Sequence, residues 1–253
     1  MLPGSAFSGA GVRVIGEAVL GHLRSIGNIS DEDSAAVLAL RGDVRSLRRH
    51  EEIIKAGDSP AFSVVVLSGF LQRYASRRDG SRQIHSFYIP GDAPSLESLY
   101  LDRVNNSLCA VVPSQVGLIS HSALRDLVQL RPRVMKLFGR SILRQSSIYC
   151  EWLARNSRLP AHASMAHLFC EMFVRCKAAG VGCGDSCDVP LTQDMLAEAL
   201  GLTAVHVNRT LQQLRETGLV DHKSGILVVN DFKRLASYAD FDPAYLQLRN
   251  GHG

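Results

Sequence analysis

The sequence predicts an α+β fold, in which a small antiparallel barrel of short strands precedes helices and a final helical motif with a β-hairpin. Three observations favour this fold. Short apolar segments separated by Gly and Pro fill residues 52–120. Helical periodicity replaces them from Ser122 onwards. Two capped helices, joined by a glycine and followed by a hairpin pattern, occupy residues 191–230.

The bulk composition is that of a globular protein with one large or two modest domains. Of the 253 residues, 46% are hydrophobic and 21% are charged. No apolar stretch approaches the roughly 20 residues that a membrane helix needs. The first basic residue is Arg13, and the residues before it lack the charged start and apolar core of a secretory signal. We therefore expect a cytoplasmic protein with no membrane contact and with its six cysteines reduced.

The N-terminal half is expected to contain a flexible arm and a β-roll. Residues 1–27 are rich in Gly and small side chains, which predicts the arm. Ser30 is placed to cap a short helix. Residues 28–121 form the predicted β-roll domain, in which Asp79-Gly80 marks a hairpin. Its expected strands cover residues 62–67, 70–75, 83–89, 108–112 and 115–119.

A long helix is predicted after the roll, within residues 122–159. Ser122 is placed to cap a short helix to Leu130, and Pro132 fits the first turn of a helix that runs to about Asn156. An apolar stripe at alternating spacings of three and four either packs on the roll or forms a dimer seam, and we favour the seam. Its residues are Met135, Phe138, Ile142, Gln145, Tyr149 and Trp152.

Residues 160–253 are expected to form a winged helix-turn-helix domain. Thr192 is placed to cap a helix that ends at Gly201, and Thr203 to cap a second helix that stops before Gly218. Residues 219–229 then read as strand, tight turn and strand. This order is typical of a motif that places its second helix in the major groove of duplex DNA.

The side chains on the outer face of the second helix are the candidate DNA contacts. Arg209 has the donors for guanine, Asn208 matches adenine, and Val205 suits a thymine methyl group. Hydroxyls at helix N-termini and a lysine on the wing suit phosphates. The full predicted set is Thr192, Gln193, Thr203, Ala204, Val205, His206, Asn208, Arg209 and Lys223.

The charge of the chain is unevenly distributed. The formal net charge is +4. Residues 122–177 carry ten basic and three acidic side chains, whereas residues 188–253 carry six basic and eight acidic ones. Because non-specific DNA affinity depends on phosphate neutralisation, we expect the helix-turn-helix alone to bind modestly and to need two copies.

The order of roll, long helix and winged helix-turn-helix resembles the Crp–Fnr superfamily of bacterial transcription regulators. The resemblance is most specific over residues 191–219, and Gly57, Gly69 and Gly91 match turn glycines of a cyclic-nucleotide-type β-roll. It implies a homodimer, a palindromic operator and contact with RNA polymerase. It implies no enzymatic activity.

Departures from the family pattern concern the effector. Leu96 stands where nucleotide-binding members have the ribose-binding Glu, and Asn106 where they have the phosphate-binding Arg. Tyr149 and Cys150 replace small hydroxyl residues that touch adenine. We therefore expect that cyclic AMP is not the ligand. The candidate effector pocket is Leu96, Glu97, Asn106, Ser107 and Tyr149.

Other departures concern the iron–sulfur cluster and the operator. The oxygen-sensing branch binds its cluster through N-terminal cysteines, but no cysteine precedes Cys109 here, so no cofactor is expected. Val205 also stands where many members have a Glu, which predicts a different operator.

Three alternative functions compete with this prediction. Cys183 and Cys187 could form a redox or metal site, although their spacing is not the usual zinc pattern, and we expect no metal. A barrel enzyme would need clustered His and Glu ligands, but His85 stands alone on the predicted strands. A winged helix that binds protein rather than DNA is disfavoured by Asn208 and Arg209.

Overall fold

The computed structural model describes residues 9–248, which form an α+β fold of two compact units. The first unit contains residues 9–71 and 88–143, and the second contains residues 72–87 and 144–248. In this part of the chain, no helix combines the length and the apolar character needed to cross a bilayer. The elements of the first unit are α1 (Gly9–Ile26), α2 (Asp31–Leu38), β1 (Asp43–Leu47), β2 (Glu52–Ile54), β3 (Phe62–Ser68), η1 (Leu96–Leu99), β6 (Ser107–Ala110), β7 (Ser114–Ser120) and α3 (His121–Leu130).

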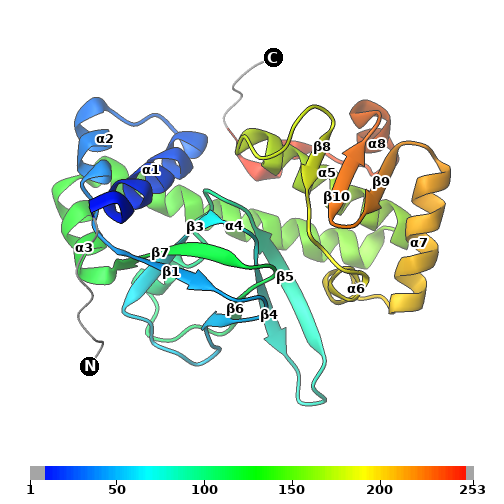
Figure 1. The fold of residues 1–253 in the computed structure, drawn as a ribbon, viewed down its shortest axis with the longest axis horizontal. Helices are drawn as coiled ribbons and strands as arrows, with labels where there is room; N and C mark the ends of the chain where they lie inside the picture. Colours follow the sequence, from blue (N-terminus) through cyan, green and yellow to red (C-terminus); the bar gives the residue numbers. More distant parts are fainter. Residues whose placement is uncertain (1–8, 249–253) are drawn as a thin grey trace. The chain divides into compact units, whose positions relative to one another are not determined.

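The first unit is built on antiparallel strands (Figure 1). Strand β7 lies between β1 and β3, and β2 pairs with β6. The strand predicted over 62–67 is β3, and those predicted over 108–112 and 115–119 are β6 and β7. Strand β1 was not predicted, because only Leu47 of its five residues is buried and the strand has no apolar alternation.

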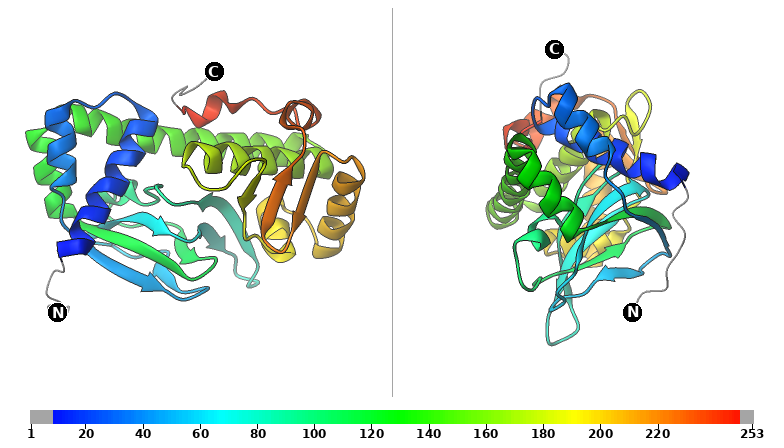
Figure 2. Two further views of the ribbon diagram at one scale, coloured as in Figure 1. Left: turned by 45° about the horizontal axis from the view of Figure 1, so that its top comes forward. Right: turned by 90° about the vertical axis from the view of Figure 1, so that its left-hand side faces the viewer.

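Helix α1 corrects the expectation of a flexible arm over residues 1–27. Residues 9–26 form one helix, while residues 1–8 lie outside the described part of the chain. In Figure 2 the helix, in dark blue, runs beside α2. Ile15, Val19 and Leu23 are buried and share one core with α2, α3 and β3. The approach is close, since a Cβ added to Gly117 would lie 2.8 Å from Cγ1 of Ile15. The prediction took the many small residues as a sign of flexibility, although apolar residues recur in this segment at helical spacing.

The capping hydrogen bonds show where two helices of the first unit begin. The hydroxyl of Ser30 accepts a hydrogen bond from the Asp33 backbone N–H, as predicted for α2. Helix α3 begins at His121, and its cap is Ser120 rather than Ser122. The Ser120 hydroxyl accepts the N–H of Ala123 at 3.2 Å. The prediction of Ser122 as the cap was therefore wrong by two residues.

In the second unit, α5 packs against the helices and strands of the winged helix-turn-helix (Figure 1). Thirteen residues of α5 are buried, so this helix is its core. Strand β10 pairs with both β8 and β9. The elements are β4 (Leu71–Ser76), β5 (Arg82–Tyr88), α5 (Ala161–Ala178), β8 (Ser186–Asp188), α6 (Gln193–Leu200), α7 (Ala204–Glu216), β9 (Val220–Lys223), β10 (Ile226–Val229), α8 (Phe232–Tyr238) and η2 (Pro243–Leu246).

Helix α4 (Pro132–Arg158) has the predicted length but not the predicted seam. Phe138 is 1% exposed in the core of the first unit, and Trp152 is 4% exposed in the second unit. Ile142, Gln145 and Tyr149 are half-buried, and only Met135 of the predicted stripe is exposed. A heptad stripe packs equally well on its own chain, and here it does, so the assignment of Phe138 and Trp152 to a dimer seam was wrong.

A buried carboxylate joins three elements of the second unit. Glu171 of α5 is fully buried and accepts hydrogen bonds from Trp152 Nε1 at 2.8 Å, the Tyr245 hydroxyl at 2.9 Å and Arg175 Nη1 at 2.9 Å. Arg155 of α4 is also buried and lies over the Trp152 ring, with its guanidinium carbon 4.6 Å from the ring centroid. Neither terminal nitrogen of Arg155 has a hydrogen-bond partner. Trp152 is therefore held by its own chain.

Candidate nucleic-acid interface

The first helix of the motif, α6, begins and ends where the sequence predicts. The hydroxyl of Thr192 accepts the backbone N–H of Met195 at 3.3 Å. Gly201 ends the helix in the left-handed conformation, with φ of 67°, which a glycine adopts without strain. Met195, Leu196 and Leu200 are buried beneath it. These local contacts fix the angle at which the chain enters the second helix.

Contacts to the C-terminal end of α6 were not predicted. The side-chain amide of Gln83 on β5 donates to the carbonyl oxygen of Glu198 at 2.8 Å. The amide of Asn156 on α4 donates to the carbonyl oxygen of Ala199 at 2.9 Å. The last carbonyls of a helix lack partners within it, so these two amides satisfy them. Both donors are distant in sequence, and no local pattern indicates them.

The second helix, α7, has an inner face that holds it in place. Thr203 caps it, accepting the N–H of His206 at 3.2 Å. Val207, Leu211 and Leu214 are buried, as predicted. Thr210 is also fully buried, and its hydroxyl donates to the carbonyl oxygen of His206 at 2.8 Å, which spares it an unsatisfied polar group. The opposite face of α7 is consequently turned to solvent.

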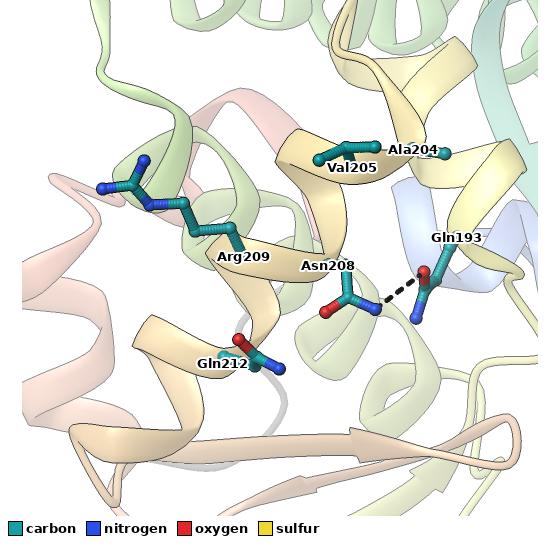
Figure 3. Close-up of a pocket in the computed structure, with 6 residues that line it drawn as sticks. All are labelled: Gln193, Ala204, Val205, Asn208, Arg209 and Gln212. Atoms are coloured by element: carbon teal, nitrogen blue, oxygen red, sulfur yellow. Dashed lines mark hydrogen bonds between the residues drawn. The ribbon is translucent and has the colours of Figure 1, made fainter.

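The outer face of α7 and the first residue of α6 line one shallow hollow of about 460 Å³. Figure 3 shows Asn208 and Gln193 pointing toward each other, with Asn208 Nδ2 donating to Gln193 Oε1 at 3.4 Å. Arg209 extends away from these two amides, and Val205 is 82% exposed. Gln212 was not among the predicted contacts, although its spacing of four from Asn208 places it on the same face. The lining residues are Gln193, Ala204, Val205, Asn208, Arg209 and Gln212.

The remaining predicted contacts are not part of the lining of this hollow and lie at exposed or half-buried positions. His206 and Thr203 are exposed at the start of α7, and Thr192 is half-buried before α6. Lys223 is exposed on the wing, at the end of β9. The wing turn consists of Ser224 and Gly225, both with positive φ. The first strand of the predicted hairpin is β9, which runs from Val220 to Lys223.

The candidate effector residues have structural contacts of their own. Leu96 is 5% exposed and belongs to the core that contains α1. The hydroxyl of Ser107 accepts the backbone N–H of Ala56 at 3.1 Å. Glu97 and Asn106 are half-buried in the same unit, and Tyr149 is half-buried in the other unit. An effector role for these five residues stays a prediction.

The cysteines considered for redox or metal chemistry have different surroundings. Cys183 is exposed and Cys187 is buried on β8. A side-chain hydrogen bond with Cys176 is the largest cause that lowers the pKa of Cys187. Within residues 9–248, no three His, Cys, Asp or Glu side chains are grouped as metal ligands.

Two family models match the chain in the predicted order. Residues 44–131 match a cyclic nucleotide-binding domain, and residues 164–238 match a Crp-like helix-turn-helix domain. The second match contains the whole hollow on α6 and α7.

Known proteins are similar to this chain along most of its length. The anaerobic regulatory protein of Haemophilus influenzae is 22% identical over 191 residues, which cover 76% of this chain and 74% of that protein. The transcriptional activator FnrL of Cereibacter sphaeroides is 24% identical over 220 residues, covering 84% and 86%. The solved structure of FixK2 from Bradyrhizobium japonicum matches with a TM-score of 0.69 and 22% identity, covering 79% of this chain and 98% of that one. The chain belongs to the Crp–Fnr superfamily of transcription regulators.

Proposed function

We propose that this regulator acts as a homodimer that reads a palindromic operator by inserting α7 into the major groove. The observation that carries the proposal is the orientation of α7. Its apolar face is buried, while Val205, Asn208 and Arg209 line an open hollow beside the start of α6. A recognition helix in this motif reads base edges with its N-terminal outer residues.

Each outer residue has the chemistry of one kind of contact. Arg209 would donate two hydrogen bonds to guanine, Asn208 would pair with adenine, and Val205 would touch a thymine methyl group. Around them, Thr192, Thr203 and Lys223 would position the motif on the phosphates, as would Gln193, Ala204 and His206 through side-chain or backbone groups. Five of these nine residues line the hollow, and the other four are exposed or half-buried, which supports this assignment.

The exposed ridge of α4 is the revised candidate for the dimer contact. Leu143 and Leu153 are 68% and 73% exposed, and Ser146 and Cys150 between them are exposed as well. Spacings of three, four and three residues separate these four positions, which is the repeat of a two-helix seam. We refer to Leu143, Ser146, Cys150 and Leu153 as the α4 ridge. The homodimer would place two copies of α7 on successive half-sites and leave other surfaces for RNA polymerase.

Replacement of Arg209 by alanine tests the proposed contact with DNA. The operator is first selected from a random duplex pool with the 253-residue chain. Arg209→Ala should then weaken binding to the selected site by about 1–3 kcal/mol per half-site and relax the preference at one base pair. Fluorescence anisotropy against single-substituted sites measures both effects.

Arg215→Ala is the matched control. Arg215 lies on the same helix but forms an ion pair with Asp221 at 2.8 Å, away from the hollow. The Arg215→Ala variant should leave the base preference unchanged. If Arg209→Ala binds the selected site as tightly as the unmodified chain does, α7 is not the reading helix. If no duplex is enriched at all, the proposed function is wrong.

A further inference from the structure

We propose that Gln193 is a positioning residue for Asn208, holding its side-chain amide in the orientation that recognises adenine. The inference rests on the proposed function, because it assigns a specificity role within the same hollow. It starts from the hydrogen bond between Asn208 Nδ2 and Gln193 Oε1. The two residues come from different helices and meet at the edge of the hollow (Figure 3).

The two amides meet on backbone that is already fixed. Gln193 is the first residue of α6, directly after the Thr192 cap, and α6 is held at its other end by Gln83 and Asn156. Asn208 follows the buried Val207 on α7. Forming the contact therefore immobilises only the side chains of Gln193 and Asn208, which keeps its entropic cost low.

The direction of this hydrogen bond determines what Asn208 has left for a base. One of the two Nδ2 hydrogens goes to Gln193 Oε1. The other hydrogen and the Oδ1 acceptor stay available. Adenine offers the matching N7 acceptor and N6 donor in the major groove, whereas guanine offers two acceptors at O6 and N7. An Asn208 amide turned by half a rotation would instead accept a hydrogen bond from Gln193 and would present its remaining donor and acceptor in the reverse order.

Gln193 also has donors of its own. With Oε1 engaged by Asn208, both hydrogens of its Nε2 stay available for a phosphate oxygen at the start of α6. A phosphate held there would fix Gln193 further, so that backbone contact and base recognition would support each other. Gln193 would then affect which base is chosen without touching that base.

The test compares acceptor and non-acceptor side chains at position 193. Gln193→Ala removes the acceptor and should reduce the preference for adenine at the Asn208-dependent base pair by at least about five-fold. Gln193→Glu keeps an acceptor, so it should retain that preference while weakening binding overall through repulsion of phosphates. In the Asn208→Ala background, Gln193→Ala should change the base preference no further.

Base preferences are measured as the ratio of dissociation constants for the selected operator and its single-base variants. Gln213→Ala is the matched control, because Gln213 is an exposed glutamine on α7 that does not line the hollow. Thermal unfolding checks that each variant is folded.

The outcomes separate this inference from the proposed function. If the unmodified chain enriches an operator but Gln193→Ala keeps its adenine preference, the positioning role is wrong and the DNA-binding function stands. The same follows if no adenine in the operator depends on Asn208. If Gln193→Glu loses the preference as fully as Gln193→Ala does, an acceptor at this position is not what matters. Failure to enrich any duplex would overturn both.

Discussion

The imidazole of His167 lies in an environment that disfavours its charged form. The side chain is 1% exposed, and its ring lies edge-on to Phe241, with centroids 4.9 Å apart. Burial, followed by the charge of Arg155, lowers the pKa of His167 from 6.5 to about 4. Glu151 Oε1 lies 3.3 Å from Nε2, yet neither ring nitrogen has a hydrogen-bond partner. The ring is therefore neutral at pH 7, and its contact with Glu151 is not an ion pair.

His167 should make the protein less stable in mild acid. The folded state binds this proton only near pH 4, whereas the unfolded chain binds it near pH 6.5. Because the unfolded state holds more protons between these values, the free energy of unfolding should fall as the pH drops from about 6.5 to about 4. The loss from this group should reach up to about 3 kcal/mol. Urea unfolding at a series of pH values measures it.

His167→Phe keeps an aromatic ring beside Phe241 and should flatten this pH dependence of the unfolding free energy. His162→Phe is the matched control on α5, where His162 is half-buried against Tyr238. It replaces a histidine of the same helix with the same ring and so controls for the substitution itself. A pH profile of His167→Phe identical to that of the unmodified chain would show that other groups are responsible.

At the scale of the element, the hydrogen bonds of Glu171 join α4, α5 and η2, but the buried charges there have unequal numbers of hydrogen-bond partners. Glu171 satisfies three donors, whereas Arg155 leaves both terminal nitrogens without any. Burial is the largest influence on the pKa of Arg155 and lowers it, while the charges of Glu171 and Glu151 act in the opposite direction. Within the described residues, only Nε of Arg155 donates, to Asn156 Oδ1 at 3.4 Å. A buried charge whose other donors lack partners carries a desolvation cost that its packing need not offset.

Replacing these two residues should therefore have opposite consequences for stability. Arg155→Met keeps the packing over Trp152 and removes the unsatisfied charge, so unfolding should occur at the same or a higher urea concentration. Glu171→Gln leaves the buried Arg175 without its counter-ion and should cost about 3 kcal/mol or more. A loss of that size in Arg155→Met would show that its guanidinium is satisfied within the fold.

The elements that could be predicted from the sequence are those whose ends are set locally. Thr192, Gly201 and Thr203 act on residues within one helical turn, so α6, α7 and the outer face of α7 followed from the sequence. The predictions of a flexible arm and of a dimer seam were wrong for another reason. An apolar stripe shows that a helix is covered but not by what, and the core over α1, like the burial of Phe138, depends on distant residues. Gln83 and Asn156 were missed for the same reason.

At the scale of the whole molecule, the α4 ridge predicts how two chains associate. In a two-fold pair of parallel helices, a side chain facing the axis meets its own counterpart. Leu153→Glu would place two carboxylates at that axis and should give monomers in sedimentation velocity. Mild oxidation should join the Cys150 side chains of two protomers, giving a dimer on a non-reducing gel.

Cys150→Ser should abolish the crosslink but keep the dimer in sedimentation. Phe138→Glu is unsuitable as a test, because Phe138 is part of the core and its replacement would unfold the first unit. Persistent dimers of Leu153→Glu, together with no crosslink through Cys150, would exclude the α4 ridge as the dimer contact.

The hydrogen bond from Gln83 gives the β4–β5 hairpin a second role. By sequence, this hairpin falls within the cyclic nucleotide-binding match, but by packing it belongs with the helix-turn-helix. Gln83 attaches it to the last turn of α6, the helix whose first residue meets Asn208. If Asn208 reads a base as proposed, any displacement of the hairpin would act on the same eight-residue helix that carries Gln193.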